Sequence, residues 1–315
     1  MNHLNRWVLS FVCLTSFALL VGCSSSSTTN EKGEGPISIV TTIAQIGEPL
    51  QRIGGDLVDV TSIMGPGVDP HTYVASQGDI GTLQQADLIF YNGLHLEGQM
   101  NEIFTKLGEE KPVLAVAEAI PEDQLLTDAA SQGAPDPHVW FDISLWKIAI
   151  SAAVEELKAY APEHAETFDK NLKTYIEELD ALQQEASSKL AKIPESKRLL
   201  VTAHDAFGYF GRAFDIEVVG LQGLSTEDEI GLSDIQKTVD TIVEAEVPAV
   251  FIETSINTSS IQAVIEGAEQ AGAEITLGGE LFSDAMGEAG TPEGTYLGMY
   301  THNVDTIYTS LAGGE

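Results

Sequence analysis

Residues 165–192 read AETFDKNLKTYIEELDALQQEASSKLAK, and this stretch decides the fold. Its apolar side chains recur every three or four positions, which is the spacing of one helix face. These side chains belong to Phe168, Leu172, Tyr175, Ile176, Leu179, Leu182, Ala186 and Leu190. The stretch contains no glycine or proline, so it predicts a stiff helix that is roughly 40 Å long. A coiled-coil dimer is the alternative, although the pattern lasts for only about three heptads.

Strands and helices alternate on both sides of this helix. Before it, β-branched and apolar runs predict strands at 37–42, 57–64, 87–91 and 113–116, with helices at 43–53, 76–86 and 143–160. After it, strands are expected at 198–202, 217–219, 249–252 and 275–277, with helices at 232–245, 259–271 and 295–311. This rhythm is typical of mainly parallel sheets that are covered by helices.

The predicted fold class is therefore α/β, with two lobes that are joined by one long rigid helix. We place the N-terminal α/β lobe at 37–161, the connecting helix at 162–193 and the C-terminal α/β lobe at 194–315. A length of 315 residues is consistent with two domains, and one large domain is the alternative. A stiff connection predicts limited tilting of the lobes rather than wide closure.

The N-terminal residues predict export and lipid attachment. A positive residue precedes the apolar run Trp7–Val21, which is shorter than the roughly 20 residues that span a bilayer core. The run ends in Leu20-Val21-Gly22-Cys23, which resembles a bacterial lipobox. We therefore expect a signal peptide at 1–22, acylation of Cys23 and a flexible polar tether at 23–36. These features predict a membrane-anchored lipoprotein outside the cytoplasm, in the periplasm or at the cell surface.

The charge balance narrows the classes of partner. Fifteen Lys and Arg stand against 48 Asp and Glu, which gives a formal net charge of −33. Such a surface repels the phosphates of nucleic acids and the headgroups of anionic lipids, so we expect no nucleic-acid partner and no membrane contact except through the lipid. A hydrophobic fraction of 43% still supports a folded core. Adaptation to salt explains the acid excess, and attraction of cations is the alternative.

The cysteines and histidines point to one kind of metal site. Cys13 leaves with the signal peptide and Cys23 carries the lipid, so a metal site in the mature chain must use histidine and carboxylate ligands. His71 and His138 each end an Asp-Pro-His tripeptide in a loop, and His204 lies where a strand passes into a helix. Ligands of open α/β sheets bind beyond the carboxyl ends of strands, and neutral imidazole suits divalent metals. The three histidines therefore predict a metal site between the lobes.

A carboxylate is expected to complete this site. It should follow the strand at 275–277, where the spacing leaves Glu280, Asp284 and Glu288 open. With no open position for water, such a site argues against a metallohydrolase, and no H-E-x-x-H or G-x-S-x-G motif is present. We therefore predict a binding protein rather than an enzyme.

Other polar and aromatic residues receive secondary roles. Asp69 and Asp136, two positions before their histidines, are expected either to orient an imidazole or to cap a turn. Asp205 and Glu253 are candidates for supporting hydrogen bonds. The remaining mature histidines are expected to be structural or exposed: His95, His164 and His302. Four aromatic residues at helical spacing are expected to lie in the core: Phe207, Tyr209, Phe210 and Phe214.

Seven segments, in order, resemble the TroA-like class of metal-binding solute-binding lipoproteins. They are GPGVDPHTY (65–73), YNGLHLE (91–97), DPHVWFD (136–142), VTAHDAFGYFGRAF (201–214), FIETSIN (251–257), LFSDAMG (281–287) and GTPEGTYLGMYTHNVDTI (290–307). These lipoproteins are extracytoplasmic receptors of ABC importers for zinc and manganese. The resemblance implies a metal bound by His71, His138, His204 and Asp284 between two lobes.

The resemblance also implies partners and cargo. The partners are an importer permease, with its cytoplasmic ATPase, and a divalent metal ion, and the receptor is expected to be monomeric. Three imidazoles and one carboxylate favour Zn²⁺ over Mn²⁺ in the general affinity order, although a bidentate Asp284 suits Mn²⁺ as well. The segment 121–135 lacks the histidine-rich loop of many zinc receptors. The ligand set makes zinc the favoured cargo, although the missing loop departs from the pattern of those zinc receptors and leaves manganese open. A surface adhesin is the alternative function.

Overall fold

The computed structural model describes residues 35–128, 133–227 and 229–313. The predicted signal peptide (1–22), Cys23 and nearly all of the tether lie outside these residues. Gly35–Glu315 form one compact unit. Among the described residues, no helix is both long and apolar enough to cross a bilayer.

The first half of this unit contains a four-stranded parallel sheet. Its strands are β1 (Ile37–Thr41), β2 (Val58–Ser62), β3 (Leu88–Tyr91) and β4 (Val113–Ala115), in the order β2-β1-β3-β4. The helices of this half are α1 (Ala44–Gly54), α2 (Gln77–Gln85), α3 (Asn101–Gly108) and α4 (Ile143–Tyr160). The buried β-branched and aromatic residues of β1 and β3 explain the central place of these strands. Helix α3 was not predicted from the sequence, because it spans only two turns and buries only Phe104 and Leu107.

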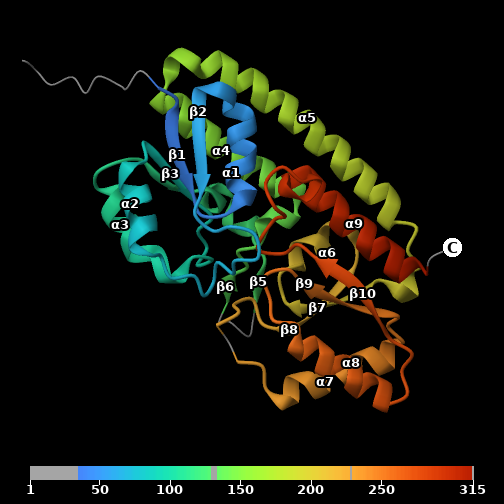
Figure 1. Ribbon diagram of the computed structural model, residues 1–315. Coiled ribbons are helices and arrows are strands. Elements are labelled where there is room, and N and C mark those ends of the chain that lie inside the picture. The colour runs from blue at the N-terminus through green and yellow to red at the C-terminus, as the bar shows by residue number, and fades with distance from the viewer. Residues whose placement is uncertain (1–34, 129–132, 228, 314–315) are drawn as a thin grey trace, which may run out of the picture. The chain divides into compact units, whose positions relative to one another are not determined.

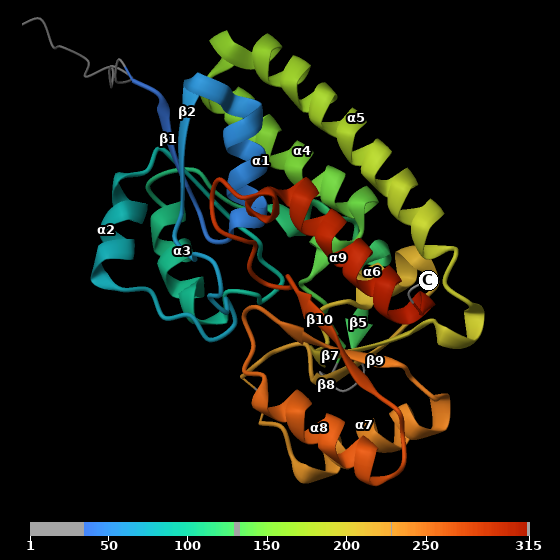
Figure 2. The same ribbon diagram turned by 45° about the vertical axis from the view of Figure 1, so that its right-hand side comes forward.

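Two parallel strand pairs form the sheet structure of the second half. They are β7 (Leu199–His204) with β8 (Glu217–Gln222), and β9 (Ala249–Glu253) with β10 (Thr276–Leu281). Strand β7 packs beside β9. Helices α7 (Leu232–Ala245) and α8 (Ser259–Gln270) lie together on one side of these strands in both views (Figures 1 and 2). Their apolar faces share a core with β7 and β9.

Short elements connect these parts. A two-residue antiparallel pair joins β5 (Thr127–Asp128) to β6 (Ala134–Pro135), and helix α6 spans Gly208–Phe214. The 3-10 helices of the described chain are Gly55–Leu57, Gly98–Met100, Val116–Ala119, Glu122–Gln124, Val139–Phe141, Pro162–His164, Glu195–Lys197 and Pro292–Gly294. Gly220 of β8 allows a close approach near the end of β7, because a Cβ there would lie 2.4 Å from the backbone nitrogen of Asp205.

The long helix is present as predicted. Helix α5 spans Ala165–Leu190 and buries the apolar face that its spacing indicated, except that Ile176 is only partly buried. Figure 2 shows it beside α4 and beside α9 (Tyr296–Ala312), and it also contacts α1. The Asn171 side chain donates a 2.8 Å hydrogen bond to the carbonyl of Ile53, at the end of α1.

One large core extends through the molecule from the first sheet to α9. It includes buried residues of β1, β3, α1, α4, α5, α6 and α9, together with Phe251 and Leu281 of the second half. The chain's last helix therefore packs on helices of the first half, and the site-bearing segments described below are attached to a common apolar body.

Candidate metal centre

Four predicted ligand residues come together in one buried cluster. His71 lies in the loop after β2, His138 follows β6, His204 is the last residue of β7, and Asp284 follows β10. One ligand atom from each lies within 4.8 Å of the others, and all four residues are buried. Because β7, β9 and β10 are neighbouring strands, their carboxyl ends deliver His204 and Asp284 to one edge.

The distances within the cluster are those of groups that face a common point. Nε2 of His138 lies 3.3 Å from Oδ1 of Asp284. Oδ2 of Asp284 lies 3.3 Å from Nε2 of His204 and 3.7 Å from Nε2 of His71. The Nε2 atoms of His71 and His138 are 3.3 Å apart. The imidazole rings are inclined to each other by 55° to 80° rather than stacked. The arrangement presents three nitrogens and one carboxylate to the same small volume.

The two Asp-Pro-His tripeptides share one turn but use their aspartates differently. In both, Oδ1 of the aspartate accepts the backbone N–H of the histidine at 2.9 Å, which closes a local turn. Oδ1 of Asp136 also lies 2.7 Å from Nδ1 of His138 and orients that ring. Asp69 instead accepts hydrogen bonds from the hydroxyls of Thr72 and Thr226. Asp136 therefore fills both roles that the sequence left open, whereas Asp69 fills only the role in the turn.

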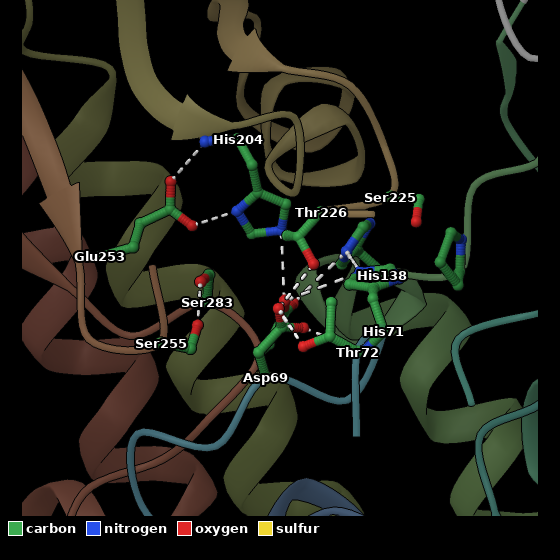
Figure 3. A network of polar contacts seen from close by, with 12 residues as sticks. Asp69, His71, Thr72, His138, His204, Ser225, Thr226, Glu253, Ser255 and Ser283 are labelled. Carbon is green, nitrogen blue, oxygen red and sulfur yellow. Dashed lines mark hydrogen bonds and ion pairs between the residues drawn. The ribbon is translucent and has the colours of Figure 1, made fainter. Parts of the chain in front are cut away.

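Glu253 was a candidate for a supporting hydrogen bond, and it supports His204. Oε2 of Glu253 lies 2.5 Å from Nδ1 of His204, and Oε1 accepts the backbone N–H of His204 at 2.9 Å (Figure 3). Glu253 is the last residue of β9, so its position depends on the neighbouring strand. A carboxylate behind the imidazole fixes which ring nitrogen faces the cluster and makes that nitrogen a better ligand.

The segment that carries Asp284 is held by hydrogen bonds to its backbone. The carbonyl of Ser283 accepts from Nε1 of Trp140 at 3.1 Å and from Nε2 of Gln45 at 3.3 Å. The Asn303 amide of α9 bonds both the N–H and the carbonyl of Phe282, at 2.9 and 2.7 Å. Asp284 is therefore positioned by residues of α1, α9 and the His138 segment.

The environment shifts the pKa values of the cluster in opposite directions. Burial, together with the charges of His138 and His204, lowers the pKa of His71 to about 4, although Asp284 opposes the shift. Burial also acts to lower the pKa of His138, but the hydrogen bond to Asp136 and the charge of Asp284 outweigh it and raise this pKa to about 9.

His204 and Asp284 show the same balance of burial and charge. Burial opposes the charged form of His204, but Glu253 and Asp284 raise its pKa well above the usual value. Burial likewise opposes ionisation of Asp284, but His204 and His138 hold its pKa well below the usual value. Asp284 is thus an anion at neutral pH.

Three buried carboxylates, Asp284, Asp136 and Glu253, outnumber the two histidines whose pKa is raised, so the centre favours a bound cation. Both oxygens of Asp284 are buried and have no well-aligned hydrogen bond. In the described part of the chain, no lysine or arginine pairs with Asp284, Asp136 or Glu253. A buried carboxylate without donors is costly unless a cation neutralises it. The donor set of three imidazoles and one carboxylate is one that holds divalent transition metals.

The other candidate residues lie apart from the cluster. Glu280 and Glu288, which the spacing left open as the fourth ligand, are both exposed. His302 contacts the Glu280 carbonyl through Nε2 at 2.9 Å. His164 packs its ring edge-on against Phe168. His95 is exposed and borders a cavity of about 800 Å³ between β3, α3 and β6.

Several supporting residues were not identified from the sequence. Tyr209 is part of the core, as expected, and its hydroxyl also donates to the carbonyl of Asp136 at 3.0 Å. Tyr296 and Tyr300 of α9 donate to the carbonyls of Trp140 and Phe141. The available signal is the residue type, because a buried tyrosine hydroxyl usually requires a partner where phenylalanine does not.

Comparisons with known proteins agree with this geometry. Residues 39–310 match the model of the family described as "ZnuA: Zinc-uptake complex component A periplasmic". The chain is 47% identical over 309 residues to the manganese-binding lipoprotein MntA of Bacillus subtilis, covering 98% of this chain and 100% of that protein. It is 44% identical over 305 residues to the zinc-binding protein TroA of Treponema pallidum, covering 97% of each. The solved structure of the periplasmic zinc-binding protein TroA from Treponema pallidum superposes with a TM-score of 0.86 at 46% identity, covering 88% of this chain and 100% of that chain.

Replacing Asp136 by asparagine tests the orienting role of this carboxylate. Asp136→Asn keeps an acceptor for Nδ1 of His138 but removes the negative charge behind the ring. We expect metal affinity to fall about 10- to 100-fold, measured by competition with a chromophoric chelator. The exposed carboxylate of Glu280 provides the control, because Glu280→Gln should bind like the unchanged protein. An Asp136→Asn affinity within about twofold of that control contradicts the orienting role.

Proposed function

Since the chain belongs to the ZnuA family of periplasmic components of zinc-uptake complexes, we propose that it captures a divalent transition metal outside the cytoplasm and delivers it to an ABC importer. The observation that carries this function is the buried cluster of His71, His138, His204 and Asp284, whose ligand atoms face one point. The family consists of binding components of uptake complexes, and four protein ligands fill a tetrahedral shell. The arrangement therefore suits capture and release of an ion rather than activation of a bound water.

We propose Zn²⁺ as the preferred cargo. Three imidazole nitrogens and one carboxylate oxygen satisfy the four-coordinate preference of zinc, and zinc ranks above manganese in affinity for such a set. Both oxygens of Asp284 border the cluster, at 3.3 Å from the Nε2 atoms of His138 and His204 respectively. A bidentate carboxylate accommodates the higher coordination of Mn²⁺, so manganese is the competing cargo. Of the two similar proteins named above, one is a manganese-binding lipoprotein and the other a zinc-binding protein.

Calorimetry on chelator-stripped protein tests the function directly. We expect one equivalent of Zn²⁺ to bind, and His138→Ala and Asp284→Ala each to weaken binding by at least about 100-fold, because each removes one of four ligands. Parallel titrations with Zn²⁺ and Mn²⁺ rank the two metals, and elemental analysis of protein from its own host identifies the cargo.

His302→Ala is the matched control for these ligand variants, because His302 lies outside the cluster and contacts the Glu280 carbonyl. It should retain the affinity of the unchanged protein. The proposal fails if the unchanged protein binds neither metal with stoichiometry, or if both ligand variants bind as the control does.

We propose that the chain is held outside the cytoplasm by a lipid on Cys23. The lipobox-like Leu20-Val21-Gly22-Cys23 and the polar segment after it support this anchor. The many acidic residues disfavour direct contact with anionic lipid headgroups, so the acyl chains are the proposed attachment.

Substitution of Cys23 tests the anchor. Cys23→Ala should abolish incorporation of labelled fatty acid and shift the protein from the membrane fraction to the soluble extracytoplasmic fraction, while metal binding by the purified protein is unchanged. Ser24→Ala is the control and should remain acylated. Continued acylation of Cys23→Ala would place the lipid elsewhere.

We also propose that 37–161 and 194–315 act as two lobes around the connecting segment 162–193, and that they tilt only slightly when metal is released. The continuous core beneath α5 and α9 supports small motion, because wide opening would expose apolar side chains such as Leu179 and Tyr300.

Small-angle scattering tests this stiffness. The radius of gyration of metal-free and metal-loaded protein should differ by no more than about 1 Å, because packed cores resist large deformation. Measurements on His138→Ala with and without metal control for effects that do not depend on the site. A larger change that requires the intact site contradicts the limited tilt.

A further inference from the structure

The four proposed ligands are held with unequal firmness. The His138 segment, residues 136–141, receives side-chain hydrogen bonds at four of its backbone carbonyls. The donors are the hydroxyl of Tyr209 to Asp136 (3.0 Å), the amide of Asn92 to Pro137 (2.9 Å), the hydroxyl of Tyr296 to Trp140 (2.6 Å) and the hydroxyl of Tyr300 to Phe141 (2.8 Å). All four donor residues are buried. The segment is thereby fixed to α6, α9 and the loop after β3.

This fixed part includes two more ligands. Trp140 of the His138 segment donates to the Ser283 carbonyl, which places Asp284 relative to His138. His204 ends a fully buried strand and is held through both its backbone and its ring by Glu253. His138, His204 and Asp284 therefore form one supported half of the centre.

The loop that carries His71 is attached differently. It follows β2, has no regular secondary structure, and its hydrogen bonds are mainly local turn contacts around Asp69. Within the described chain, the Tyr73 hydroxyl ties the end of this loop to Asp79 of α2, at 2.8 Å. Thr226 ties the part of the loop next to His71 to a segment far away in the sequence. The Thr226 hydroxyl donates to Oδ2 of Asp69 at 2.6 Å, and Oδ1 of Asp69 accepts the N–H of His71 (Figure 3).

The side chain of His71 has less support as well. His138 and His204 each have a carboxylate behind Nδ1, whereas in the described part of the chain no carboxylate reaches Nδ1 of His71. His71 is also the most exposed of the four, at 4%. It is thus the ligand that can leave the centre with the least disruption of other contacts.

We propose that Thr226 is a positioning residue, which holds the His71 loop over the bound metal through Asp69 and so limits the rate of metal release. The inference rests on the proposed function. When the Thr226–Asp69 bond opens, the His71 loop loses its connection to the segment after β8 while the other three ligands stay in place. The metal then leaves through the side of the centre from which His71 has withdrawn.

Stopped-flow transfer of Zn²⁺ from loaded protein to excess chelator tests this role. Thr226→Val keeps the shape of the side chain but removes the hydroxyl, and it should accelerate release about tenfold, because the lost bond is one to a charged acceptor. Thr226→Ser restores a hydroxyl and should release Zn²⁺ at the rate of the unchanged protein. The melting temperature of the metal-free Thr226→Val protein should fall no further than that of the metal-free Thr72→Val control described below, which separates positioning from general stability.

Thr72→Val is the matched control, because the Thr72 hydroxyl donates to the same Asp69 oxygen, at 3.0 Å, from within the loop. Its release rate should stay within about twofold of that of the unchanged protein, since the connection to Thr226 remains. Equal rates for Thr226→Val and the unchanged protein overturn the inference, as does equal acceleration by Thr72→Val. Failure of the unchanged protein to bind any Zn²⁺ or Mn²⁺ overturns the proposed function as well.

Discussion

The buried carboxylate of Asp284 is the constraint on which the arrangement of the centre depends. Its two oxygens are removed from water without well-aligned donors, and two further carboxylates, Asp136 and Glu253, lie behind the imidazoles. Such a concentration of buried negative charge is unstable by itself, and the histidines offset it only in part. A divalent cation at the point that the four groups face resolves this electrostatic problem. The chemistry of the cluster and the proposed function therefore have the same cause.

The rest of the fold holds these groups in place against their mutual repulsion. Helix α9 contributes Asn303 to the Asp284 segment and two tyrosine hydroxyls to the His138 segment, while its apolar face packs on α5. A long helix without glycine or proline gives these contacts a firm base. The apolar core and the polar supports are thus connected, because α9 contributes to both. Only the His71 loop lacks comparable support, which is why the proposed release begins there.

The net charge of −33 has a different origin from the charge of the centre. One acidic residue, Asp284, is a proposed ligand, and two more, Asp136 and Glu253, orient ligands. Other acids serve local structure, such as Asp79 in the capping box of α2 and Asp142 at the N-terminus of α4. Surface acidity raises the local concentration of cations in a general way, whereas selection of a metal depends on geometry inside the protein.

Periodicity and residue type by themselves determined the alternation of strands and helices, the long helix α5, and the three histidines as ligand candidates. These features are local, because a helix face or a buried strand is written in consecutive residues. The sequence spacing could not distinguish Asp284 from Glu280 or Glu288, since that choice depends on where the chain turns after β10. It also could not show that Glu253 lies behind His204 or that Thr226 reaches Asp69, 157 positions away. Those contacts exist only after the strands have paired and α9 has packed on the first half, so the tertiary structure alone decided them.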